Sequence, residues 1–478
     1  MSAAFEPLAP IPADAGATDR RRGFRTGARE IDAAPVRVEG RLPAWLHGRL
    51  LLNGPALWEL SNGHFEHWFD GLAMLHRLQI GPGGVSYRSR FARSRSYTQA
   101  MATGAPPTAE FDTPSPASLW TRLKGAPVTD NPAVVMSRVG SSWIAVTETP
   151  TLMRFDPDTL ETLGPLPIDD DTRIHLMAAH GHTDDAGNYW NVGIRLGPKC
   201  DVMLFRLRPG STRREVVASL RMRKAGYTHA FAMTARHAIV WETAVRAQAL
   251  SFRFSAKSYI RNFRWEPASG SRLHAISLAD GSVRSWDAPP MMCFHAIQAW
   301  EEGKTFVAEL SIYEDATILE DLRLAPLRQG QAQRCVPKLM RYRLEPGRGE
   351  ALMEPFGEAF ELPQVHPARW GHARAGVAWG AGLDARDPSG FLDRTVRLDL
   401  RTGERKQWQR ESAIQLEPLF VPRPGSSAED DGVLLVPTLA DGDATTVIGV
   451  IDAASMACVA RLHTPQVVPF GFHAAWAP

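Results

Sequence analysis

Four histidines in apolar surroundings are the residues of this chain best suited to chemistry. The chain contains fifteen histidines and no HEXXH motif, so spacing alone does not select a metal-binding set. Four of them lie between small, apolar or aromatic neighbours, a context that predicts buried side chains. These four are His180 (MAAHGH), His229 (GYTHAFAMT), His295 (MMCFHAIQAW) and His473 (PFGFHAAW). One buried histidine is usually a hydrogen-bonded core residue, whereas four in one domain suggest a shared partner such as a zinc, copper, iron or nickel ion.

His182 is a competitor for His180. The two residues form a His-Gly-His pair at positions i and i+2, which would share one face of a β-strand. The alternative interpretation is one satisfied polar side chain and one exposed side chain. Either histidine therefore remains a candidate ligand on this pattern alone.

Three glutamates lie in apolar segments where an unpaired carboxylate would be costly. They are Glu148 (VTETP), Glu361 (FELP) and Glu417 (LEPLFVP). A metal-bound histidine normally donates its other N–H to a carboxylate or carbonyl, and glutamates in such positions could accept that hydrogen bond. The alternative for each is a surface glutamate at the end of a strand.

The elements that must position these residues are predicted to be short β-strands. Apolar runs such as WIAVT (143–147), VMLFRL (202–207) and GVLLVP (432–437) alternate with Gly- and Asp-rich turns. This texture indicates a sandwich, a barrel or a propeller. A propeller of several four-stranded blades would absorb roughly 440 residues as one domain. The stretches 97–123 and 244–266 lack strand pattern and are predicted to be long connections, which in compact domains are usually functional.

Composition excludes several classes of protein. The chain has 478 residues, with 54 Lys and Arg against 52 Asp and Glu, so it lacks the basic excess of a nucleic-acid-binding protein. Four cysteines without a CxxC pair argue against a disulfide scaffold and a thiolate zinc site, and they fit a cytoplasmic protein. There is no apolar run of about 18 residues. Residues 1–36 are predicted to be a flexible N-terminal arm without a signal peptide, and residues 37–478 a single domain.

Several longer motifs resemble the carotenoid cleavage oxygenase family, most closely the animal-type branch of β-carotene oxygenases and the retinoid isomerase. The motifs include HWFDGLAMLHRL (67–78), TETPTLMRFDPDTLETLG (147–164), AAHGHTDDAGNYWN (178–191) and EPLFVPRP (417–424), and the resemblance runs from about residue 38 to the end of the chain. It implies an all-β fold, a seven-bladed β-propeller with a cap of loops and short helices over an iron ion on the propeller axis.

The resemblance also implies the site. Its four iron(II) ligands match His180, His229, His295 and His473. The glutamates that orient three of those ligands, His229, His295 and His473, match Glu148, Glu361 and Glu417. His180 would then have no carboxylate. The family usually has proline after the first ligand, whereas this chain has Gly181 followed by His182, which keeps His182 in competition.

The resemblance further implies a dry, apolar tunnel beside the iron. Aromatic residues near the motifs or in the cap are candidates for its wall, together with Val134, which stands where cleaving members commonly have threonine. The candidates are Phe69, Tyr97, Trp120, Val134, Phe231, Phe254, Trp265, Phe294 and Trp370. For each of them, ordinary core packing is the alternative.

The implied function is cleavage of one C=C bond of a carotenoid or apocarotenoid with O2, which gives aldehyde or ketone products. One alternative is an iron-dependent retinoid isomerohydrolase-like activity. Another is stilbene cleavage, for which Tyr97 could bind a phenol although 129–134 lacks the matching lysine. A third is a non-catalytic carotenoid binder.

An apolar substrate predicts contact with a membrane surface. Residues 107–123 carry Phe111 and Trp120 and are the candidate for peripheral contact. The alternative is a buried segment of the cap. The sequence therefore predicts a cytoplasmic protein with a peripheral membrane surface, a polyene and O2 as its small-molecule partners, and no nucleic acid.

Overall fold

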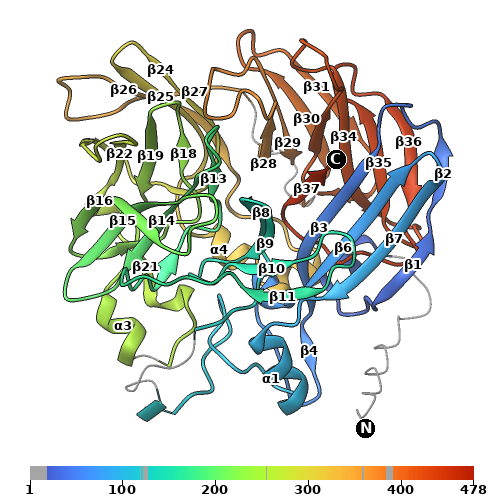
Figure 1. The fold of residues 1–478 in the computed structure, drawn as a ribbon, viewed down its shortest axis with the longest axis horizontal. Helices are drawn as coiled ribbons and strands as arrows, with labels where there is room; N and C mark the ends of the chain where they lie inside the picture. The colour runs from blue at the N-terminus through green and yellow to red at the C-terminus, as the bar shows by residue number, and fades with distance from the viewer. Residues whose placement is uncertain (1–18, 119, 122–127, 255, 358–359, 384–390) are drawn as a thin grey trace.

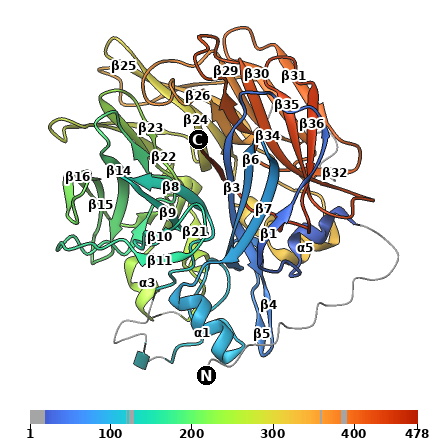
Figure 2. The same cartoon turned by 45° about the vertical axis from the view of Figure 1, so that its right-hand side comes forward.

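Seven antiparallel sheets of four to six strands surround a central axis as the blades of a β-propeller (Figures 1 and 2). The computed structural model describes residues 19–118, 120–121, 128–254, 256–357, 360–383 and 391–478. The blades follow one another along the chain. This confirms the predicted all-β propeller, and the short strands separated by Gly and Asp turns are its blade strands.

The first three blades come from the N-terminal half. Blade 1 has β1 (Ile31–Pro35), β3 (Gly48–Leu57), β6 (Leu72–Gly81), β7 (Gly84–Phe91) and β37 (Ala474–Ala477). Blade 2 has β8 (Val135–Val139), β9 (Ser142–Val146), β10 (Met153–Phe155) and β11 (Thr162–Pro165). Blade 3 has β12 (Leu176–Met177), β13 (His182–Thr183), β14 (Tyr189–Arg195), β15 (Cys200–Leu207) and β16 (Arg214–Met222).

The remaining four blades complete the ring. Blade 4 has β18 (Ala232–Met233), β19 (His237–Glu242), β22 (Ser271–Ser277) and β23 (Val283–Ala288). Blade 5 has β24 (Met292–Glu302), β25 (Thr305–Tyr313), β26 (Lys338–Leu344) and β27 (Leu352–Pro355). Blade 6 has β28 (Phe360–Val365), β29 (Val377–Gly382), β30 (Arg394–Asp399) and β31 (Arg405–Gln409). Blade 7 has β2 (Arg37–Gly40), β32 (Ala413–Gln415), β33 (Leu419–Pro422), β34 (Gly432–Ala440), β35 (Val447–Asp452) and β36 (Cys458–His463).

The hydrophobic core lies between neighbouring blades. Strands in the middle of a blade are apolar on both faces, and β34 is buried along its whole length. Outer strands such as β27 are exposed and carry charge, which discourages pairing with another chain. Rings from adjacent blades interlock, as where Trp379 of blade 6 stacks on Phe420 of blade 7 with centroids 4.4 Å apart. Each blade therefore buries its faces against its two neighbours.

Short helices and loops gather over one face of the propeller, at the bottom of Figures 1 and 2. The α-helices are α1 (Arg95–Thr103), α3 (Ala249–Phe254), α4 (Ile318–Asp321) and α5 (Leu324–Gln329). The small strands outside the blades are β4 (Glu59–Leu60), β5 (Gly63–His64), β17 (Ala225–Gly226), β20 (Val245–Ala247) and β21 (Phe263–Trp265). The 3-10 turns are η1 (Arg20–Phe24), η2 (Trp68–Asp70), η3 (Ile260–Asn262) and η4 (Pro267–Ser269). Within the described residues, no helix is both long and apolar enough to cross a bilayer.

Only part of the predicted flexible N-terminal arm, residues 1–36, can be compared with the structure. Residues 1–18 lie outside the described residues. From residue 19 the chain is built into the propeller rather than loosely attached: Phe24 is fully buried, the Arg328 Nε donates to the Phe24 carbonyl at 2.9 Å, and β1 pairs with β7. The apolar Phe24 ring and the free edge of β7 supply the contacts that hold this segment.

The ends of the described chain close the ring. β37 pairs with β3 in blade 1, and β2 pairs with β36 in blade 7, so the first and last blades each contain strands from both ends. Just before β37 the backbone of Gly471 passes directly against β3. A Cβ at Gly471 would overlap the Asn53 carbonyl oxygen, and a Cβ at Gly54 would overlap the Gly471 Cα. Glycine at both positions therefore permits the closure.

We expect Gly471→Ala to lower the free energy of unfolding by about 1–3 kcal/mol, because the added methyl forces two backbones apart. Chemical denaturation of purified protein measures this. Gly81→Ala is the matched control, since a Cβ at Gly81 meets no atom within 4 Å. Equal stability of the two variants would show that the closure does not depend on this contact.

Candidate metal centre

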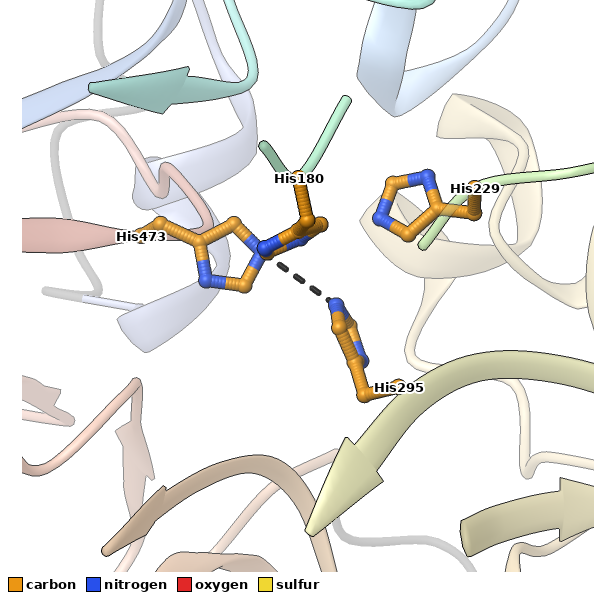
Figure 3. A group of neighbouring side chains, drawn as sticks. All are labelled: His180, His229, His295 and His473. Atoms are coloured by element: carbon orange, nitrogen blue, oxygen red, sulfur yellow. Dashed lines mark hydrogen bonds between the residues drawn. The ribbon is translucent and has the colours of Figure 1, made fainter. Parts of the chain in front are cut away.

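The four histidines singled out in the sequence meet at the propeller axis. His180 lies between β12 and β13, His229 between β17 and β18, His295 in β24, and His473 directly before β37. They come from four different blades, and Figure 3 shows their imidazoles turned toward one another. One ring nitrogen from each lies within 4.8 Å of the others. Such a group is able to bind a metal ion.

Backbone irregularities aim two of the side chains at the centre. The register between β24 and β25 shifts between Cys293 and His295, and the register between β28 and β29 shifts after Glu361. A bulge re-aims the side chains around it. Leu362, which follows Glu361, has a positive φ of 53°, a strained conformation for leucine that the surrounding sheet imposes.

Three buried carboxylates hold three of the imidazoles. The Nδ1 atoms of His229, His295 and His473 lie 2.7, 2.7 and 2.8 Å from carboxylate oxygens. The respective partners are Glu148, Glu361 and Glu417. An ionised carboxylate only accepts, so each Nδ1 carries the hydrogen and each Nε2 presents a lone pair to the axis.

The carboxylates have their own hydrogen bonds. The Tyr227 hydroxyl donates to Glu148, the Gln364 amide donates to Glu417 at 3.0 Å, and the Ser311 hydroxyl donates to Glu361 at 3.3 Å. Burial still raises the pKa of Glu361 to about 7. A cation on His295 would favour the ionised carboxylate and lower this pKa again, so metal binding and ionisation of Glu361 are coupled.

The distance between two of the ring nitrogens tests whether the site fits a metal ion. The Nε2 atoms of His295 and His473 are 3.2 Å apart. With both Nδ1 atoms protonated, these lone pairs face each other and repel unless a cation lies between them. Neighbouring ligands at metal–nitrogen distances of about 2.1 Å lie about 3 Å apart. The observed separation therefore matches two ligands of one ion.

His180 has a free lone pair as well. Its Nε2 is buried and has no hydrogen-bond partner among the described residues. Burial, together with the neighbouring His473, His229 and His295, holds the pKa of His180 well below its usual value. A neutral, unsatisfied imidazole nitrogen at this position is the chemical condition for a fourth ligand.

His182 is engaged elsewhere. The Trp370 Nε1, which is only a donor, lies 3.1 Å from the His182 Nδ1, and the His182 Nε2 lies 2.8 Å from the Phe231 carbonyl oxygen. The ring thus accepts at Nδ1 and donates at Nε2, with both nitrogens satisfied. His182 instead links blade 3 to the loops of blades 4 and 6.

An apolar cavity opens directly onto the four-histidine group. His229, His295 and His473 form part of its wall. Of the predicted wall residues, Phe69, Val134 and Phe294 line it. Lining residues that the sequence did not predict are Trp68, Tyr313, Ile318, Leu322, Gln333, Leu362, Leu383, Phe391, Leu392 and Phe472. Trp68 belongs to the HWFDG motif and Phe472 precedes His473, so both could have been predicted from these signals. Tyr313, Ile318 and Leu322 have no such signal.

Five predicted wall residues lie elsewhere. Tyr97 stacks on Phe91 with centroids 5.4 Å apart, and Trp120 is 75% exposed. Phe231 and Trp370 contact His182, and Trp265 lies on β21 outside the lining. These residues do not line this cavity, since proximity to a motif in sequence does not say which way a ring points in the fold. Phe254 ends α3, and its side chain lies outside the described part of the structure.

Comparison with known proteins relates the whole chain to enzymes of one kind. The family described as retinal pigment epithelial membrane protein matches residues 24–478. The chain is 32% identical to the rice carotenoid cleavage dioxygenase 8 homolog A, chloroplastic (Oryza sativa subsp. japonica), over 97% of this chain and 89% of that protein. It is 28% identical to the human beta,beta-carotene 15,15'-dioxygenase over 91% of each.

Solved structures share the fold. A variant of the Synechocystis apocarotenoid oxygenase superposes with a TM-score of 0.85 at 22% identity, over 96% of this chain and 99% of that one. The cobalt-substituted Synechocystis enzyme gives the same TM-score and identity over 96% and 98%.

We expect His180→Ala to abolish stoichiometric metal binding, because it removes a lone pair from the centre. His182→Ala should keep the metal and lower only the free energy of unfolding, by about 1–2 kcal/mol for the lost hydrogen bonds. Elemental analysis of the purified variants, alongside chemical denaturation, measures both effects. If the His182 variant lost the metal and the His180 variant retained it, His182 and not His180 would be the ligand.

Proposed function

Because this chain belongs to the carotenoid oxygenase family described as retinal pigment epithelial membrane protein, we propose that it is a non-haem iron(II) dioxygenase that cleaves a C=C bond of a carotenoid or apocarotenoid. The observation that carries the proposal is the direct opening of a buried four-histidine group onto an apolar cavity. The products would be two aldehydes, or an aldehyde and a ketone, each with one oxygen atom from O2.

The choice of metal rests on chemistry. Imidazole nitrogen suits several metals, but zinc has no redox chemistry and so cannot activate O2. Iron(II), held by His180, His229, His295 and His473, would supply the electrons that let O2 react with an alkene. Four neutral ligands leave the charge of the ion uncompensated, and Glu148, Glu361 and Glu417 provide negative charge one hydrogen bond away.

The protein's own part is to place the substrate and exclude water. Phe69 packs edge-to-face on Phe472 at 4.8 Å and on Phe294 at 6.2 Å between centroids, which makes an aromatic wall beside the histidines. A polyene in this cavity gains contact with rings and aliphatic side chains along its length, and one of its double bonds is held next to the metal. Apolar, aromatic walls of this kind are typical of small-molecule sites.

The proposal also includes a surface of the cap that contacts a membrane. Of residues 107–123, Phe111 is half-buried against Phe69, whereas Trp120 is exposed; residues 119, 122 and 123 lie outside the described residues. Leu250 on α3 is also exposed on the cap. We infer that the cap of this otherwise cytoplasmic protein touches the bilayer where polyenes dissolve.

Labelled oxygen tests the reaction. Iron-loaded protein incubated with a panel of carotenoids and apocarotenoids under ¹⁸O2 should give carbonyl products, trapped at once by borohydride as alcohols, with one ¹⁸O in each fragment by mass spectrometry. The metal-deficient His180→Ala protein is the control. Label from H2¹⁸O instead would indicate isomerohydrolase-like chemistry, and the absence of any product across a panel that includes stilbenes would contradict the proposal.

Vesicle flotation tests the cap contact. We expect Trp120→Asp to lower the partition coefficient into phosphatidylcholine vesicles more than tenfold, because a buried indole contributes about 2 kcal/mol at an interface. Leu352→Asp, on the exposed outer strand β27, is the matched control. Equal flotation of wild type and both variants would place the contact elsewhere.

A further inference from the structure

A second large cavity lies away from the four histidines, in a groove between blades 3 and 4 beside α3. None of its lining residues lines the cavity at the metal centre. Its walls come from the end of β16 and the turn after it, from β19 and β20, and from β22. Nothing in the proposed oxygenase reaction uses this groove.

The groove carries a surplus of positive charge. Six cationic side chains line it, namely Lys199, Arg221, Arg223, Lys224, Arg246 and Arg272. Four of these pair with carboxylates: Arg221 with Asp201, Lys224 with Glu266, Arg246 with Glu242, and Arg272 with Asp287. Among the described residues, Lys199 and Arg223 have no carboxylate partner, and both are exposed. Lys199 and Arg223 therefore contribute two positive charges that no described carboxylate pairs with.

Two buried nitrogens in the same wall lack partners. The His274 side chain is almost fully buried, its Nδ1 lies 2.8 Å from the Ser285 hydroxyl, and its Nε2 has no hydrogen-bond partner among the described residues. The Arg246 Nε–H is likewise buried and unpartnered. A buried polar atom without a partner is unfavourable, and a bound water, ion or ligand is one way to satisfy it.

The His274 ring is a neutral donor. Burial and the nearby Arg272 lower the pKa of His274 to about 4. A Glu242 oxygen 4.0 Å from the Nε2 favours the tautomer with hydrogen on that atom, and the Ser285 hydroxyl then donates to Nδ1. His274 and Arg246 thus offer two buried N–H groups in the groove wall, both next to the Glu242 carboxylate, and Lys199 and Arg223 add exposed cations at the rim.

We propose that this groove binds the phosphate group of an anionic ligand. A phosphate oxyanion has several acceptor oxygens for the His274 and Arg246 donors, and its charge of up to −2 matches the two uncompensated cations at the rim. Arginine guanidinium groups suit phosphate geometry in particular. The phosphate could belong to a soluble compound or to a phospholipid headgroup, since α3 adds the exposed Leu250 to the same lining.

Titration with inorganic phosphate tests the site. Calorimetry at constant ionic strength should show saturable binding to the full-length protein. The double variant Lys199→Glu with Arg223→Glu should weaken it by about tenfold or more, because two charge-assisted contacts become repulsive. The matched control is Arg37→Glu with Arg41→Glu, two exposed arginines at β2 on blade 7, which should bind as wild type does.

A second variant separates a built site from general charge attraction. His274→Leu removes a donor without changing the net charge and should weaken phosphate binding several-fold, with folding checked by circular dichroism. Flotation with phosphatidylcholine vesicles containing phosphatidylglycerol then distinguishes the sources: loss in the double variant beyond its control indicates a headgroup, and unchanged flotation indicates a soluble phosphate compound. No phosphate binding, or equal binding by wild type and the groove variants, would overturn the proposal.

Discussion

The structure depends on the hydrogen bonds from three imidazole Nδ1–H groups to buried carboxylates. These bonds decide which nitrogen of His229, His295 and His473 carries the proton, and so they turn the opposite lone pairs toward one point. A carboxylate in this apolar interior would be costly by itself. Hydrogen-bond donors reduce this cost. They come from the three histidines and from Tyr227, Gln364 and Ser311. A cation at the centre balances the negative charge of the carboxylates.

A propeller suits this arrangement because each blade contributes an inner edge to the axis. The four histidines come from four blades, so no single strand or hairpin contains the site, and its geometry exists only when the ring is closed. His473 stands immediately before β37, the strand that closes blade 1 on β3. The closure of the fold and the completion of the centre are therefore one event. A metal that binds only the closed ring stabilises it by mass action.

The residues of the metal centre could be predicted from the sequence more completely than those of the cavity wall. The apolar flanks of His229 and His295 encode their burial, and the resemblance supplied the common partner and the propeller. The sequence left both His180 and His182 as candidate ligands. The structure distinguishes them, because Trp370, 188 positions away from His182, donates a hydrogen bond to the His182 ring. The cavity wall was harder to predict, because Phe231 and Phe472 both precede a short strand and have similar apolar neighbours, yet only Phe472 lines the cavity. The groove could not be foreseen, since Lys199, Arg223 and His274 meet only through the packing of two blades.

The geometry of the four histidines requires one ion bonded to four neutral imidazoles and to no carboxylate. Crystals of iron-loaded protein, measured on both sides of the iron absorption edge, test this requirement. We expect a single strong anomalous peak within bonding distance of the Nε2 atoms of His180, His229, His295 and His473, about 2.1 Å from each. A peak bonded to His182 or to an oxygen of Glu148, Glu361 or Glu417, or no peak at the axis, would contradict it.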